Sequence, residues 1–257
     1  MRPVPAALAL GLALTAAQAV APAAANSLLD ASDTAIYRQA FALVERNQWV
    51  EARVLASTAG DPLPGKFIQW LDLIRPGPGR DFDEITRFMR DNPDWPGQIS
   101  LQEQGERAMP ANIGAEETLA WFADREPRTI EGAMRLARAL FAKGLDQQAV
   151  NLVRRSWAQL PIDSTVSGPF LASYAQYLQP EDHVARLDRL LWEGQAEAAE
   201  RMMSLVGPEH RALATARIKL RRQDGGVDAA IERVPESLIR DAGLVYERAR
   251  WRRQAGD

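Results

Sequence analysis

A recurring junction between helices constrains this chain more than any other feature of its sequence. In three places an apolar stretch with helical spacing ends at Asn or Gly, and an Ala follows five positions later. The junctions run from Leu43 to Asn47 with Ala52, from Leu140 to Gly144 with Ala149, and from Leu190 to Gly194 with Ala199. Asn and Gly tolerate the left-handed conformation that ends many helices, and Ala lets the returning helix pack closely. The pattern therefore predicts antiparallel helical hairpins.

A weaker fourth junction runs through Gly225 to Ala230, with Arg221 in the place of the Leu. The four junctions are unequally spaced along the chain, whereas a strict repeat array would space them evenly. Tandem hairpins bury their apolar faces by stacking on one another. The sequence thus predicts an all-α protein, an irregular superhelix or solenoid that occupies residues 26–257 as one domain.

Helical spacing of apolar residues continues through nearly the whole chain after residue 30, and no convincing alternation typical of strands occurs. Pro- and Gly-rich segments at 75–80 and 92–96 predict loops. The expected helices span residues 31–46, 49–59, 63–74, 81–92, 99–108, 115–125, 130–143, 146–159, 166–178, 180–192, 196–206, 208–222, 227–234 and 235–253.

Residues 1–25 have the pattern of a cleavable signal peptide. Arg2 precedes an apolar stretch at 6–21, and Ala23 to Ala25 provide the small residues that signal peptidase needs. We therefore expect export to the periplasm, with no membrane span after cleavage. The chain has no Cys, so neither a disulfide framework nor a lipidated Cys is expected.

The composition argues against several function classes. The formal net charge of −3 provides no basic footprint for nucleic acid. The two His residues, His183 and His210, have no partner at the spacing of metal ligands, and His183 is expected to form a local hydrogen bond. No nucleophile elbow or phosphate-binding Gly loop is present. The sequence thus predicts no catalytic, cofactor-binding or metal-binding residue.

Two features remain as candidate contacts. Most of the seven Trp residues have spacings that predict core packing, but Trp95 stands between Asp94 and Pro96 in a predicted loop. An aromatic face suits the apolar side of a pyranose, so Trp95 is the candidate glycan contact. The helix expected at 235–253 runs into a turn-like end, as if another helix should follow. It is predicted to expose an apolar stripe of Leu238, Leu244, Val245, Tyr246 and Trp251, open to a protein partner or to more chain.

Several segments together resemble the N-terminal α-superhelical region of the soluble lytic murein transglycosylases of Gram-negative bacteria. The fairly specific blocks are Asn92-Pro93-Asp94-Trp95-Pro96 and the Asp-His-x-x-Arg-Leu-Asp pattern at 182–188. Further matching segments lie at 82–88, 121–122, 136–140, 154–157, 189–192, 212–220 and 234–248. The resemblance covers about residues 31–257.

The resemblance implies a scaffold rather than a catalyst. In that family a separate lysozyme-like domain cleaves the MurNAc–GlcNAc bond of peptidoglycan and leaves a 1,6-anhydro end. Its catalytic Glu lies in a Glu-Ser pair that precedes a Gly-Leu-Met-Gln stretch. Here Glu236-Ser237 follows Pro235 without that stretch, so we interpret the pair as unrelated to catalysis. The chain would then reach glycan strands through a catalytic domain that this sequence lacks.

Two other functions stay open at this point. The first is a free-standing periplasmic adaptor that binds a protein or peptide in its superhelical groove. The second is an independent glycosidase, which the sequence supports less because its carboxylates have the positions of helix caps and exposed faces.

Overall fold

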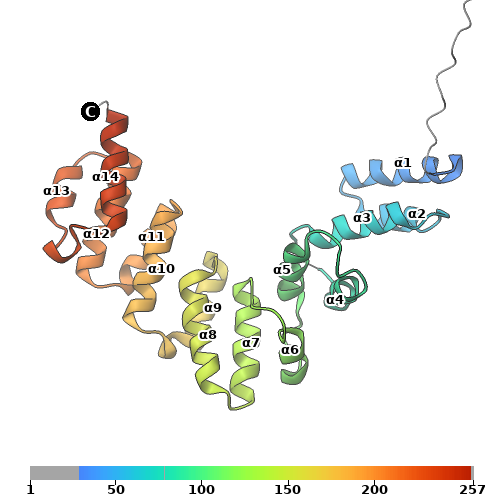
Figure 1. The fold of residues 1–257 in the computed structure, drawn as a ribbon, viewed down its shortest axis with the longest axis horizontal. Coiled ribbons are helices and arrows are strands. Elements are labelled where there is room, and N and C mark those ends of the chain that lie inside the picture. Colours follow the sequence, from blue (N-terminus) through green and yellow to red (C-terminus); the bar gives the residue numbers. More distant parts are fainter. Residues whose placement is uncertain (1–28, 78, 256–257) are drawn as a thin grey trace, which may run out of the picture. The chain divides into compact units, whose positions relative to one another are not determined.

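The computed structural model describes residues 29–77 and 79–255, and every regular element within these ranges is a helix (Figure 1). The prediction of an all-α protein is confirmed. The expected signal peptide at 1–25 lies outside the described residues. The chain divides into two compact units that meet inside one helix, so we treat residues 29–69 as the N-terminal unit and residues 70–255 as the C-terminal unit. None of the described helices is both long and apolar enough to span a bilayer.

The N-terminal unit contains α1 (Ala31–Glu45), α2 (Trp49–Ala56) and the first part of α3 (Leu63–Ile74). Its small core consists of Tyr37, Ala40, Ala52, Ala56 and Ile68. The buried carboxylate of Asp33 accepts hydrogen bonds from the backbone N–H groups of Gly60 and Asp61, at 2.8 and 2.7 Å. This contact fixes the loop after α2 against the start of α1.

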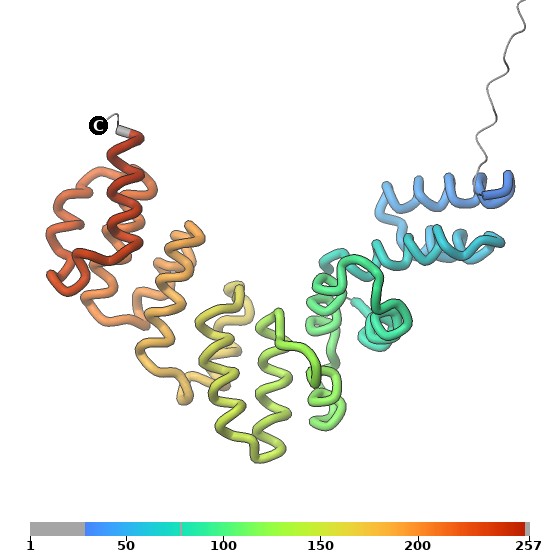
Figure 2. The backbone as a smooth tube through the Cα atoms, viewed as in Figure 1, coloured from blue at the N-terminus to red at the C-terminus, as the bar shows by residue number. Residues whose placement is uncertain are grey.

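The C-terminal unit contains the remaining helices, which pack mainly on helices one or two places away along the chain (Figure 2). Thus α7 packs on α8, α8 on α10, α10 on α12, and α12 on α14. The helices are α4 (Phe82–Asp91), α5 (Gln98–Ala108), α6 (Ala115–Trp121), α7 (Ile130–Ala142), α8 (Asp146–Gln159), α9 (Ser164–Tyr174), α10 (Pro180–Trp192), α11 (Ala196–Met202), α12 (Pro208–Arg222), α13 (Val227–Glu232) and α14 (Ala242–Ala255), with 3₁₀ segments η1 (Ala175–Tyr177), η2 (Met203–Leu205) and η3 (Glu236–Leu238).

The three strong junctions form as the sequence predicts. Asn47, Gly144 and Gly194 all have positive φ, at 59°, 70° and 75°. In each junction the N–H of the next residue donates to the carbonyl of the Leu five positions earlier, at 2.9 Å. The corresponding Ala residues, Ala52, Ala149 and Ala199, are completely buried against the preceding helix. Each junction therefore closes a hairpin by a Schellman-type C-cap and a close helix contact.

The fourth junction differs from its prediction. The left-handed residue is Gln223, with φ 58°, and not Gly225. The N–H of Asp224 donates to the carbonyl of Lys219 at 3.0 Å. Lys219 thus has the position that a Leu has in the other three junctions. Gly225 and Gly226 lengthen the connection, so Ala230 comes seven positions after the left-handed residue. It is nevertheless buried, at 3 % exposure.

The junctions make a local prediction about stability. A Cβ added at Gly144 would meet no atom of the described residues within 4 Å, so Gly144→Ala changes little except the backbone energy. We expect this substitution to lower the free energy of unfolding by about 1 kcal/mol, because Ala is strained at positive φ. Urea unfolding monitored by circular dichroism measures the change. Asn47→Gly is the control and should cause no loss; equal behaviour of the two variants would contradict the left-handed junction.

The predicted helix at 235–253 is broken, and the prediction of its exposed stripe is wrong in part. After η3 the carboxylate of Asp241 accepts from the N–H of Leu244 at 2.8 Å and starts α14 anew. Leu244 faces α12 and is fully buried. Leu238 and Trp251 are half-buried against the same cluster. Val245 and Tyr246 are exposed as expected, each at 51 %.

Some other predicted ends are also too long. The helices expected to reach 178 and 206 end at Tyr174 and Met202, because their last turns tighten into η1 and η2. The helix expected to reach 125 ends at Trp121 and continues as turns. Such tightening satisfies the last carbonyl groups of a helix without extending it.

Candidate functional site

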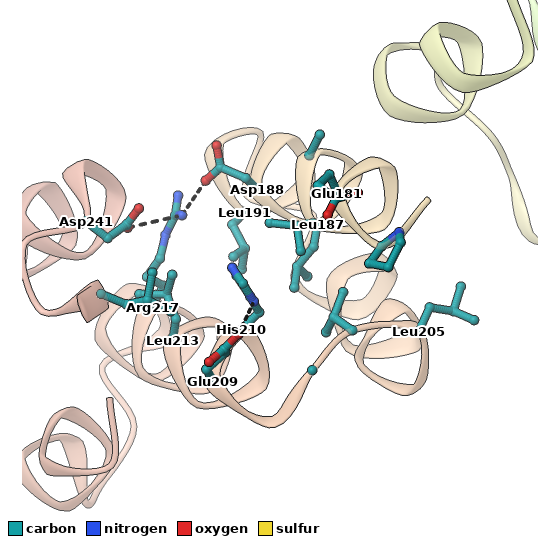
Figure 3. Close-up of a pocket in the computed structure, with 16 residues that line it drawn as sticks. Glu181, Leu187, Asp188, Leu191, Leu205, Glu209, His210, Leu213, Arg217 and Asp241 are labelled. Carbon is teal, nitrogen blue, oxygen red and sulfur yellow. Dashed lines mark hydrogen bonds and ion pairs between the residues drawn. The ribbon is translucent and has the colours of Figure 1, made fainter. Parts of the chain in front are cut away.

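A groove of about 570 Å³ lies between α10 and α12 in the C-terminal unit (Figure 3). Its floor consists of Leu187 and Leu191 from α10 and Leu213 from α12, which are nearly buried. The segment η2 contributes Leu205, which is 36 % exposed. The turn before α14 contributes Asp241. A hollow of this size between helices is typical of sites that take a small molecule or a short peptide segment.

The starts of the two helices place an acidic residue at the groove from each side. Pro180 and Pro208 occupy the first position of α10 and α12, where a missing N–H costs least. Glu181 and Glu209 therefore occupy the second position of each helix, where the helix dipole favours a negative charge. Both side chains line the groove.

Arg217 on α12 connects the groove to the neighbouring helices. Its guanidinium is 2 % exposed, and Nη1 lies 2.5 Å from Asp188 Oδ1 on α10 and 3.5 Å from Asp241 Oδ1 (Figure 3). Its Cζ also lies 5.2 Å from the ring centroid of Trp192. A Cβ added at Gly243 would overlap the same guanidinium, so α14 approaches it through a Gly. Arg217 therefore holds α10, α12 and α14 together.

The polar side chains of the groove are predominantly acidic. Four carboxylates line it, from Glu181, Asp188, Glu209 and Asp241, against the one guanidinium of Arg217. Asp188 and Asp241 already share that guanidinium, whereas Glu209 Oε1 lies 3.8 Å from His210 Nδ1. The groove thus combines an apolar floor with negative charge at its sides.

Trp95, the candidate glycan contact, lies apart from this groove, in the turn after α4. It is half-buried, and its ring makes an edge-to-face contact with Phe88 at a centroid distance of 6.0 Å. The turn is tied to α3 because Trp70 Nε1 donates to the carbonyl of Pro96 at 2.8 Å. Gln98 Nε2 donates to the carbonyls of Asn92 and Trp95. The role of Trp95 in glycan binding stays a prediction.

The residues at 182–188 tie α10 to its neighbours. The carboxylate of Asp182 accepts a hydrogen bond from the backbone N–H of Gln179, the N-cap residue of α10, at 2.8 Å. It also accepts one from Nε of Arg154 on α8 at 2.7 Å. His183 Nδ1 accepts from Trp157 Nε1 on α8 at 3.1 Å, so its hydrogen bond joins two helices and is not the local one expected of it. Burial lowers the pKa of His183 and so favours the neutral imidazole.

Arg186 completes this connection. Its Cζ lies 4.6 Å from the Trp157 ring centroid, and its guanidinium donates to the carbonyl of Trp157 at 3.0 Å and to that of Leu160 at 3.3 Å. Burial lowers the pKa of Arg186 to about 10. The guanidinium therefore satisfies the last carbonyl groups of α8 and fixes α10 against that helix end.

Glu106 is a buried carboxylate that the sequence did not single out. It is 1 % exposed and accepts from Thr129 N at 2.6 Å, Thr129 Oγ1 at 2.7 Å, Arg128 N at 2.9 Å and Gln102 Nε2 at 2.8 Å. Burial raises the pKa of Glu106, while these hydrogen bonds act to lower it. The carboxylate fixes the start of α7 on α5. Gln102, four positions before Glu106 on the same helix face, was the available sequence signal.

The Glu-Ser pair that the sequence analysis considered lies outside this groove. Glu236 and Ser237 are exposed in η3. Within residues 29–77 and 79–255, no cluster of three or more His, Asp or Glu side chains could hold a metal ion. No protein-family model, curated protein or solved structure matches this chain. The groove between α10 and α12 offers a ligand apolar side chains to cover and carboxylates to pair with, as a binding surface does.

Proposed function

We propose that this chain is the N-terminal scaffold part of an exported lytic transglycosylase of the periplasm, and that it is non-catalytic on its own. The whole enzyme would cleave the MurNAc–GlcNAc bond of peptidoglycan with formation of a 1,6-anhydro end. Glycan strands would meet the enzyme through a catalytic domain outside this sequence. The observation that carries the proposal is that both specific blocks of the family resemblance form joints between helices.

The first block, at 182–188, supports a scaffold because its polar residues are used in packing. Asp182 and Arg186 bind α8, and Asp188 binds Arg217 on α12. Each contact crosses from α10 to another helix and spans more than twenty residues of sequence. These three charged residues therefore fix α10 against the helices on either side of it.

The second block, at 92–96, supports the same interpretation. Asn92 Nδ2 donates to the carbonyl of Phe88 at 2.9 Å and ends α4, while Trp95 packs on the core of α4 and α5. The carbonyl of Pro96 accepts from Trp70. The block therefore sets the turn between α4 and α5 and the position of both on the end of α3.

A glycan-release assay tests whether the chain acts alone. Purified residues 26–257, incubated with isolated sacculi, should release no 1,6-anhydro-muropeptides above the buffer control, as measured by liquid chromatography and mass spectrometry of the soluble fraction. A full-length lytic transglycosylase of known activity serves as the positive control. Release that is abolished by replacing one carboxylate of this chain would establish an independent glycosidase and overturn the scaffold proposal.

The second candidate function is a free-standing periplasmic adaptor for a protein or peptide. The apolar and acidic groove between α10 and α12 favours it, as does the exposure of Val245 and Tyr246 on α14. The two functions differ in whether the natural protein includes a catalytic domain. They share the requirement that the stacked hairpins present a binding surface.

A further inference from the structure

We infer that the groove between α10 and α12 binds a protein segment that presents apolar side chains together with at least one Lys or Arg. This inference rests on the proposed role of the chain as a scaffold and specifies the partner of that scaffold. Three properties of the groove lead to it: the apolar floor, the unbalanced carboxylates, and the kinds of side chain that line it.

The floor of the groove accounts for the apolar part of the partner. Leu187, Leu191 and Leu213 are packed from below and turn their remaining surface to the groove. Leu205 stands at the edge with about a third of its surface exposed, and Val184 lies partly exposed on α10. Covering these side chains removes apolar surface from water, which is the main driving force for association of this kind.

The carboxylates of the groove account for the Lys or Arg of the partner segment. Arg217 pairs with Asp188 and Asp241 through Nη1, and its buried Nε and Nη2 present almost no surface to the groove, so the exposed charge of the groove is that of the carboxylates. Glu181 and Glu209 stand exposed at the groove, one from each helix, and each is available to a basic side chain of a ligand in the groove. An anionic ligand would be repelled by the same groups, because like charges placed together disfavour the wrong partner.

The lining side chains favour a protein segment over a sugar. No Trp, Tyr or Phe is among the described residues that line the groove, so it has no aromatic face on which the apolar side of a pyranose could stack. The floor instead offers Leu side chains along two helices, the arrangement that receives the apolar anchors of a helix or a short extended peptide.

The test is a selection for peptides. A random peptide library displayed on phage is selected on the immobilised chain, and the enriched peptides are sequenced and synthesised. Enriched peptides should contain Lys or Arg beside Leu, Ile or Phe. Their binding, measured by fluorescence anisotropy, should weaken with salt because exposed charge pairs are screened. Their affinity for the double variant E181Q/E209Q should fall roughly tenfold, as expected when two exposed charge pairs are lost.

Two further variants make the result specific. Glu197→Gln removes a carboxylate from the same second helical position, in α11, outside the groove, and should leave peptide affinity unchanged. Leu205→Gln removes the exposed apolar edge and should weaken binding at low and high salt alike. Circular dichroism and the unfolding temperature confirm that each variant is folded before binding is compared.

The outcomes separate this inference from the scaffold proposal. The inference is overturned by three results: no enrichment, enrichment of acidic or uncharged peptides, or equal effects of E197Q and E181Q/E209Q. Enrichment of uncharged peptides that require Leu205 would leave a scaffold with a different partner. The transglycosylase proposal is tested separately, by the glycan-release assay and by the mass of the natural protein.

Discussion

Glu106→Ala is expected to lower the free energy of unfolding by at least about 3 kcal/mol, because buried donors that lose their acceptor cost about 1–3 kcal/mol each. Glu106 accepts hydrogen bonds from four donors, and two of them are backbone N–H groups at the start of α7. Alanine would leave these donors unpaired inside the joint between α5 and α7. Urea unfolding followed by circular dichroism and by Trp fluorescence measures the loss.

Glu103→Ala is the matched control for this prediction. Glu103 lies one turn earlier on α5, and its side chain is 37 % exposed and 3.8 Å from Arg107. Its replacement should change stability by no more than about 0.5 kcal/mol, as for most exposed positions. If the two alanine variants were equally stable, Glu106 would not hold the start of α7.

The dependence on pH gives a second readout at the same position. Burial raises the pKa of Glu106 above its ordinary value of 4.5. A carboxyl whose pKa is higher in the folded than in the unfolded protein stabilises the fold fully below 4.5, and this contribution is lost as the pH rises through the raised pKa. The stability of the natural protein relative to Glu106→Gln should therefore decrease as the pH rises through that range. An increase would show that the hydrogen bonds outweigh burial.

Gly243→Ala is expected to lower the free energy of unfolding by about 2 kcal/mol, because added volume in a packed site displaces its neighbours. The new Cβ would overlap the guanidinium of Arg217. That group cannot move freely, since it is buried and paired with Asp188 and Asp241. The sign of this change in stability is informative, because a Gly-to-Ala substitution inside a helix otherwise stabilises a protein by roughly 0.5–1 kcal/mol.

Gly225→Ala provides the comparison that fixes this sign. Gly225 lies in the connection between α12 and α13 without a positive φ, and an added Cβ would meet no atom of the described residues within 4 Å beyond its two chain neighbours. This substitution should stabilise the protein by up to about 1 kcal/mol, because Ala restricts the unfolded chain more than Gly does. Differential scanning calorimetry of both variants would show opposite shifts of the unfolding temperature. A stabilising Gly243→Ala would contradict the close approach of α14 to Arg217.

The sequence was sufficient to predict features that depend on local chemistry. The left-handed conformation of Asn47, Gly144 and Gly194 could be predicted because few residue types tolerate it. The starts of α10 and α12 follow from Pro180 and Pro208, and the end of α10 follows from the junction at Gly194. Gln223 was missed because a long polar residue at positive φ has no local signature, and the two Gly that follow it were better candidates.

The site depended on contacts that the sequence does not reveal. Arg217 and Glu106 stand in helices rich in charged residues, where a charge usually faces water. Their burial follows from partners on other helices more than twenty residues away. The break before α14 likewise depends on Asp241 acting as a cap, which turns Leu244 toward α12. The groove arises from the packing of α10 on α12, so its acidic side chains could not be brought together from periodicity alone.

The mass of the natural protein tests the central proposal most directly. Intact-mass spectrometry of the protein recovered from periplasm should give a value well above that of residues 26–257, with fragment peptides that continue past Asp257 and no residues of the signal peptide. That result would support the scaffold part of a larger transglycosylase. A mass equal to residues 26–257 would contradict it and would favour the free-standing adaptor.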